Sequence, residues 1–243
     1  MIGQPFAMPM VKPFIPKALQ PWLYLACAVV FQLVNTIFLG SLQQMVGSTQ
    51  LMQEDIMFIF ICGEVGVAMP FPLLFRLKFR FTNRQLELFA VSGMTTCLLL
   101  TLALFNLTDV HQTMPLLCLL SYACGYFKLM ATFEIFSNIQ LWMTPKRDFR
   151  IFFPLLYMVV LGDISASSWI SQQLTYYTGS WQSMQWLMVG LLLAVLLFLY
   201  VATRPFRFMK PLPFISIDWL GLVLWSLSLL MAIWIFLYGE HYN

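Results

Sequence analysis

The segment RLKFRFTNRQLELFAVSGMTTCLLLTLALFN, residues 76–106, is the strongest indication of the fold of this chain. Four basic residues open it: Arg76, Lys78, Arg80 and Arg84. An apolar run follows, from about residue 86 to residue 106. A helix needs about 20 apolar residues to cross the roughly 30 Å hydrocarbon core of a bilayer. Basic residues beside such a run mark its cytoplasmic end. The stretch therefore predicts a transmembrane helix that begins at the cytoplasmic side.

The same alternation of basic segments and apolar runs continues along the whole chain. We predict seven spans, at about 20–42, 54–75, 86–106, 114–141, 151–175, 182–203 and 215–238. Twelve of the thirteen basic residues precede the first run or follow the second, fourth and sixth, and Lys128 alone lies inside a span. The connections at about 43–53, 107–113 and 176–181 have no Lys or Arg. The positive-inside rule therefore places the amino terminus in the cytoplasm.

This pattern divides the chain into four parts. We expect a cytoplasmic leader at 1–19, a six-helix bundle at 20–203, a basic cytoplasmic linker at 204–214, and a seventh transmembrane helix within 215–243. Composition favours the same fold class, an all-α multi-pass membrane protein embedded in a lipid bilayer. Hydrophobic residues make up 60% of the chain and charged residues 9%, whereas roughly a quarter of an ordinary soluble domain is charged.

The sequence does not contain the features that several classes of function require. The net charge of +3 arises from short connections that set orientation, so it does not indicate nucleic-acid binding. Motifs for phosphate loops, zinc proteases and serine hydrolases are absent from the sequence. The five cysteines fall in apolar runs without metal-ligand spacing. We therefore expect neither an enzyme nor a metal or cofactor site.

Ionisable residues inside spans are the first candidates for function, because charge is costly in a bilayer. These residues are Glu64, Lys128, Glu134 and Asp163. One interpretation is that an acid exchanges protons while Lys128 tunes its pKa. The alternative is that Lys128 pairs with an acid only to satisfy the fold. Either way, spans two, four and five are expected to turn these residues away from lipid.

Asn35 and Gln32 make the first span polar for a lipid-facing helix. Two interpretations stay open for them. They line a cavity, or they form hydrogen bonds between helices.

The segment PLLFRLKFRFTNR, residues 72–84, resembles a motif of the major facilitator superfamily. That motif, P-L-x-G-x-L-x-D-R-x-G-R-R, forms the cytoplasmic loop between the second and third helices of those transporters. Arg76, Arg80 and Arg84 fit it, whereas Phe79 replaces its aspartate. The resemblance implies that the three arginines belong to a cytoplasmic loop.

Two further segments narrow the resemblance. LGDISASSW, residues 161–169, falls where proton-driven exporters have G-P-x-x-G-G, although Asp163 replaces the proline. IDWLGLVLWSL, residues 217–227, is similar to the extra seventh helix of fourteen-helix drug:proton antiporters. Together with FRFMKPLPFISIDWLG, it resembles divergent exporters of the Bacteroides type. Those exporters usually work with a periplasmic adaptor and an outer-membrane channel.

The resemblance implies the amino-terminal half of a proton-coupled secondary exporter in the bacterial inner membrane. Its substrates would be amphipathic organic compounds, moved in exchange for protons. Members of that family are about twice as long, so the chain is expected to be a fragment, or a half that needs a second transporter half. We do not expect it to transport alone. The alternative function is a structural or assembly subunit of a membrane complex.

Overall fold

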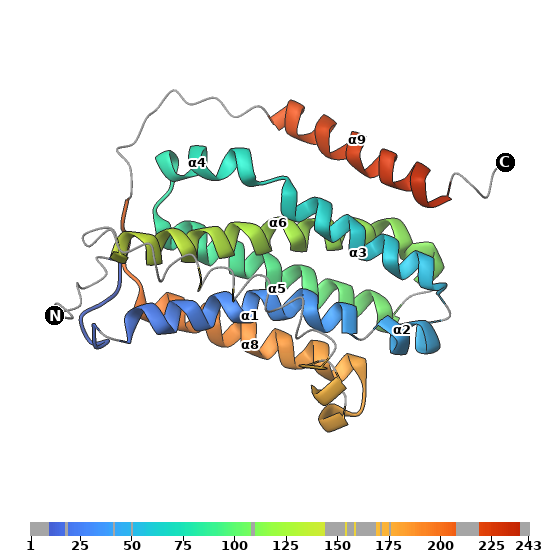
Figure 1. Cartoon of the computed structure of the whole chain (residues 1–243), viewed down its shortest axis with the longest axis horizontal. Coiled ribbons are helices and arrows are strands. Elements are labelled where there is room, and N and C mark those ends of the chain that lie inside the picture. The colour runs from blue at the N-terminus through green and yellow to red at the C-terminus, as the bar shows by residue number, and fades with distance from the viewer. Residues whose placement is uncertain are drawn as a thin grey trace.

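A computed structural model describes most of the 243 residues of this chain. The described residues are 10–17, 19–40, 42–49, 51–107, 110–143, 154, 158, 169–170, 172–174, 176–207 and 219–238. Nearly all of them are helical, and this part of the chain contains no strand (Figure 1). The all-α fold class predicted from the sequence is confirmed at this level.

Eight helices account for most of the described residues (Figure 1). They are α1 (Gln20–Gly40), α2 (Leu42–Thr49), α3 (Gln53–Ala68), α4 (Phe71–Arg80), α5 (Asn83–Leu107), α6 (Val110–Met143), α8 (Trp181–Ala202) and α9 (Trp219–Tyr238).

Within the described residues, three helical stretches are long and apolar enough to cross a membrane. These are Asn83–Asn106 in α5, Thr113–Ile139 in α6 and Trp181–Ala202 in α8. The shorter apolar stretches Gln20–Val34 and Leu220–Ile235 belong to α1 and α9. The seven predicted spans are thus supported at three places by length and hydropathy together. The expected fifth span, 151–175, falls almost entirely outside the described residues.

The predicted second span, 54–75, is wrong as a single helix. The chain stops α3 at Ala68 and starts α4 at Phe71. Pro70 lies at the break, where its ring fixes φ and removes a backbone N–H donor. Its carbonyl accepts from Leu73 N and Leu74 N at 2.9 and 3.0 Å, which begins the new helix. With 16 residues, α3 is only about 24 Å long at about 1.5 Å per residue.

Two connections that the sequence analysis expected as loops are helical instead. The motif at 72–84 lies mostly in α4, and only Phe81 and Thr82 separate α4 from α5. The expected connection at 43–53 contains α2. In both places the polar or basic composition led to the prediction of a connection. Polar residues indicate an exposed surface, but they do not exclude a helical backbone.

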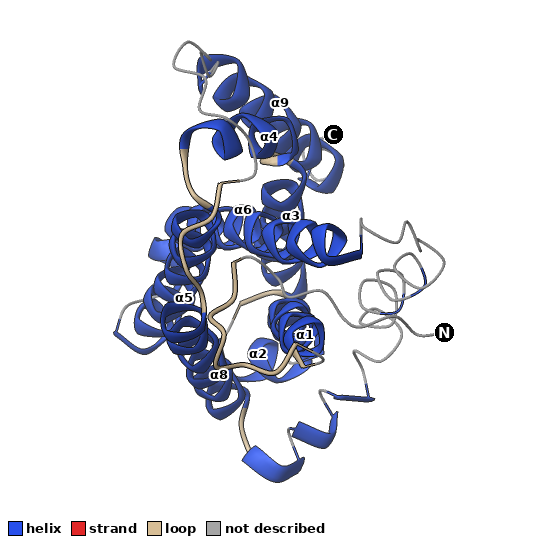
Figure 2. Ribbon diagram, turned by 90° about the vertical axis from the view of Figure 1, so that its left-hand side faces the viewer, coloured by secondary structure: helices blue, strands red, loops and turns tan. Residues whose placement is uncertain are grey.

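Helix α6 lies at the centre of the bundle. It packs against α3, α5 and α1, while α5 and α1 also contact α8 (Figure 2). Helix α9 packs on α3, and a hydrogen bond of 2.7 Å joins Tyr122 Oη of α6 to Ser226 Oγ of α9. These contacts bury a large apolar core together with polar side chains such as Glu134 and Asn138.

Glycines allow α3 and α6 to approach closely. A Cβ on Gly66 would collide with the backbone of Tyr122, and one on Gly125 would collide with the backbone of Gly63. Small residues at such crossings let two backbones meet without intervening side chains. This contact fixes the position of α6 relative to α3 by shape.

Backbone hydrogen bonds bring several basic segments together at one end of the bundle. Lys12 N donates to the carbonyl of Ala202, and Arg204 N donates to that of Met10, each at 2.8 Å. Asn83 N donates to the carbonyl of Phe206 at 2.9 Å. The segment before α1, the start of α5 and the end of α8 therefore meet at this place, which we call the basic end.

Candidate functional site

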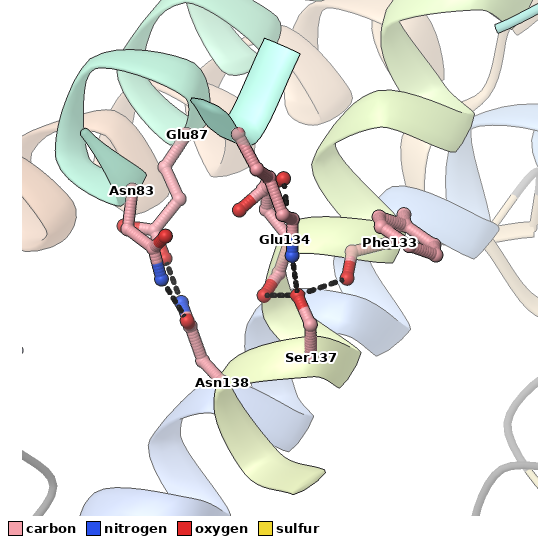
Figure 3. Close-up of polar contacts among 7 residues, drawn as sticks. Asn83, Glu87, Phe133, Glu134, Ser137 and Asn138 are labelled. Atoms are coloured by element: carbon pink, nitrogen blue, oxygen red, sulfur yellow. Dashed lines mark hydrogen bonds and ion pairs between the residues drawn. The ribbon is translucent and has the colours of Figure 1, made fainter. Parts of the chain in front are cut away.

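A cluster of buried polar side chains lies at the basic end, between α4, α5 and α6 (Figure 3). Lys78 Nζ of α4 lies 3.5 Å from Glu134 Oε1 of α6. The same ammonium donates a hydrogen bond to Ser137 Oγ, one turn further along α6. Both ends of the ion pair are enclosed, with Lys78 4% and Glu134 0% exposed.

A chain of carboxamides continues the cluster toward α5. Asn83 donates through Nδ2 to Asn138 Oδ1, and Asn138 donates through Nδ2 to Glu87 Oε1 (Figure 3). All three residues are buried. Asn83 and Glu87 are four residues apart on α5, so they share one face of the helix. This face meets the last turns of α6, where Glu134 and Asn138 are also four residues apart.

Glu134 is the least satisfied member of the cluster. Neither of its carboxylate oxygens has a hydrogen-bond partner among the described residues. Its contact with Lys78 is ionic, at a distance beyond that of a strong charged hydrogen bond. A buried carboxylate without hydrogen bonds is costly in low dielectric. Among the groups of the cluster, Glu134 would therefore be stabilised most by binding a proton or by a new hydrogen-bond partner.

Lys78 is held among both charged and aromatic groups. Its Nζ lies 4.7 Å from the centre of the Phe133 ring, a cation–π distance. Burial lowers the pKa of Lys78, and the carboxylate of Glu134 acts in the opposite direction. The ammonium is therefore stabilised mainly by its neighbours on α6, not by solvent.

A second feature is a small cavity inside the bundle. It holds about 50 Å³ and is lined by residues of α1, α3, α5, α6 and α8. Its polar side chains are Thr101, Ser121 and Gln185, and Gln185 is buried. A cavity of this size has room for a few water molecules, and these side chains offer the polar partners that buried water requires.

The structure separates the four ionisable candidates named from the sequence. Glu134 and Lys128 are buried on α6. Glu64, expected to turn away from lipid, is instead exposed on the surface of α3. The reason is that α3 turns its glycines toward α6, so the neighbouring position 64 lies on a different face. Asp163 lies outside the described residues.

The two cavity candidates in the first span have different outcomes. Gln32 is buried in α1, but the α1 residue that lines the cavity is Val34. The side chain of Asn35 lies outside the described residues.

The three arginines of the expected loop motif lie in different surroundings. Arg76 and Arg80 are exposed on α4. Arg84 lies in the first turn of α5, where Nη2 donates to the carbonyl of Tyr200 at 2.9 Å. Its guanidinium carbon also lies 5.0 Å from the centre of the Tyr200 ring. Arg84 thus joins α5 to the end of α8 instead of extending from a loop.

Sequence reasoning missed Lys78, Glu87, Asn138 and Gln185 as site residues. Lys78 counted only as an orientation signal, and Glu87 was not among the ionisable candidates inside spans. A sequence signal did exist for Glu87. It lies between Leu86 and Leu88 at the start of an apolar run, three residues after a basic position. Gln185 is likewise an amide within an apolar helix.

Comparison with known proteins finds no matching family model, no matching curated protein and no matching solved structure. The fold itself therefore defines the class: over the residues that the structure describes, the chain is almost entirely helical and has three helices long and apolar enough to cross a membrane.

Proposed function

We propose that this chain forms one helical bundle of a proton-coupled secondary exporter of amphipathic organic compounds in the bacterial inner membrane. The observation that carries this proposal is the buried Glu134 carboxylate, ion-paired with Lys78 but without a hydrogen-bond partner among the described residues. A carrier that exchanges protons needs an enclosed acid whose charge can change during transport.

The charge balance of the cluster supports proton binding. Glu87 and Glu134 lie on neighbouring helices, and Lys78 is close enough to interact with both. Two carboxylates and one ammonium carry a net charge of −1 when all are ionised. One proton would neutralise this set. Ionisable groups enclosed between helices are costly, and that cost is a reason to associate them with function.

A second bundle would complete the transport pathway. Alternating access moves one bundle against another around a site between them, and the sequence resemblance described above implies such a second half. A periplasmic adaptor and an outer-membrane channel are the further partners that the resemblance implies. The cavity beside Gln185 lies within this bundle, so it would be a hydrated interior space and not the shared substrate site.

The proposal is tested by proton-linked binding to the purified full chain in detergent micelles. The probe is tetraphenylphosphonium, an amphipathic cation whose own charge does not change with pH. Binding is followed by fluorescence of the eight tryptophans. If one proton competes with one cation, affinity rises with pH by up to about tenfold for each pH unit.

Glu134→Gln should bind the probe with an affinity that no longer depends on pH. Glu54→Gln is the matched control, because Glu54 is exposed in the first turn of α3. It should keep the pH dependence of the original chain. The proposal fails if the original chain binds the probe with an affinity that does not depend on pH, or if Glu134→Gln leaves the pH dependence unchanged.

A structural role is the second candidate, and the chain from Asn83 through Asn138 to Glu87 favours it. These side chains satisfy one another by hydrogen bonds, as an interhelical lock in a membrane complex would require. In that case Glu134→Gln should change thermal stability, and no proton-linked binding of the probe should be found.

A further inference from the structure

An apolar groove runs between α5 and α8 on the outside of the bundle. It encloses about 440 Å³, and its walls include Leu88, Phe89, Leu193, Leu197 and Tyr200. Most of these side chains are exposed. Figure 2 shows α5 and α8 side by side at the edge of the bundle, where no other labelled helix covers them. If these two helices cross a bilayer, as their length and hydropathy permit, the groove faces lipid.

A fixed cation lies at one end of this groove. Arg84 is held by its hydrogen bond to the Tyr200 carbonyl and by its position over the Tyr200 ring. The guanidinium has five N–H donors. Only one of them is on the Tyr200 carbonyl, and the Arg84 side chain is partly exposed. Arg84 therefore keeps donor capacity for an anion beside the last groove residue, Tyr200.

Two further basic residues lie at this end. Arg204 and Arg207 are exposed just after α8. The Asn83 N to Phe206 carbonyl hydrogen bond keeps that segment beside the start of α5. Glu87, one turn after Arg84, is buried and contacts Asn138 of α6. The nearest acid on α5 is thus engaged on the side of α6, while Arg84 faces α8.

We propose that this groove binds one anionic phospholipid, with an acyl chain between α5 and α8 and the phosphate on Arg84. The apolar walls match the acyl chain, and the arginine matches the phosphate, to which guanidinium groups bind strongly. Basic pockets at the cytoplasmic ends of transmembrane helices recognise anionic headgroups in this way. The positive-inside rule places the basic end at the cytoplasmic leaflet. This site does not depend on transport or on the Glu134 cluster.

The test measures lipid retention by native mass spectrometry on the purified, delipidated full chain. Dioleoyl phosphatidylglycerol and dioleoyl phosphatidylcholine are added separately, so the acyl chains are the same and only the headgroup charge differs. We expect one tightly retained phosphatidylglycerol and about tenfold weaker retention of phosphatidylcholine, the effect of losing one charged hydrogen-bonded contact.

Two variants locate the site. Arg84→Gln should reduce phosphatidylglycerol retention to the level of phosphatidylcholine, whereas Arg76→Gln, at an exposed position of α4, should not. Ser92→Phe places a bulky ring in the groove that Ser92 lines and should reduce retention of both lipids. This second variant keeps the test valid if Arg84→Gln does not give monodisperse protein.

The proposal is overturned if the two lipids are retained equally by the original chain. It is also overturned if phosphatidylglycerol is retained unchanged by Ser92→Phe and by every folded Arg84 variant, because the lipid then binds elsewhere.

Discussion

Helix α6 contacts its neighbours in two different ways. Against α3, the contact is made by Gly63, Gly66 and Gly125, and backbones meet without intervening side chains. Against α4 and the first turns of α5, at the basic end, the contact includes charged and carboxamide side chains such as Glu134 and Asn138. The first contact depends on shape and the second on charge. One helix in an apolar bundle can thus be held by two independent kinds of contact. Each kind can be removed by its own substitutions.

Breaking the shape-based contact should have the largest effect. Gly66→Val places a branched side chain against the backbone of Tyr122, which cannot move without displacing α6. We expect a loss of more than about 5 kcal/mol, beyond the usual range of about 1 to 3 kcal/mol for overpacking a core, because the collision is with backbone and not with a side chain that could turn away. Most of the protein should then fail to elute as a monodisperse peak in size-exclusion chromatography.

The matched control is Gly190→Val on α8. A Cβ at Gly190 meets no atom within 4 Å, so this variant carries the same change in helix propensity without a collision. Equal losses in the two variants would show that propensity, and not close packing, explains the result.

Breaking the charge-based contact should have the second largest effect. Lys78→Met leaves the Glu134 carboxylate buried without its ion-pair partner, and removing one partner of a buried pair typically costs about 3 to 5 kcal/mol. Adding Glu134→Gln removes the uncompensated charge and should restore much of the thermal midpoint. Arg80→Met, at an exposed position of the same helix, should change the midpoint little. A double variant no more stable than Lys78→Met would contradict this account.

A single neutral hydrogen bond should have the smallest effect. Tyr122→Phe removes the hydroxyl that contacts Ser226 of α9, at a cost of about 1 kcal/mol. Ser226→Ala should lower the thermal midpoint by a similar amount, and the double variant should lower it no further. Tyr126→Phe is the control on the same helix, since the Tyr126 hydroxyl has no hydrogen bond within the described part of the chain. If Tyr126→Phe lowers the thermal midpoint more than Tyr122→Phe does, the loss of stability in Tyr122→Phe is not explained by the hydrogen bond between α6 and α9.

Much of the fold could be predicted from the sequence because helix length and hydropathy are local properties. The predicted spans at 86–106, 114–141 and 182–203 correspond closely to the apolar stretches of α5, α6 and α8. The second predicted span failed because hydropathy does not register a change of backbone. Pro70 divides an apolar run that remains apolar on both sides of the break.

The candidate site was less predictable because it depends on which helix faces pair. Glu134 was named from its place inside a span, and it lies in the buried cluster. Glu64 was named by the same rule, yet it is exposed. The rule measures depth along one helix and cannot tell which of its faces meets a neighbour. Lys78 was counted only among orientation signals, although α4 places it against α6.

The helical class, the lengths of the main apolar helices and the segregation of basic residues between them can all be inferred from the order of the amino acids alone. These features follow from transfer free energies and charge, which each segment carries independently of the rest. The meeting of Lys78, Glu87, Glu134 and Asn138, and the place of Arg84 beside Tyr200, follow from the packing of the folded helices. Such meetings depend on helix rotation and close approach, which the packing of whole helices sets through contacts such as those of Gly66 and Gly125.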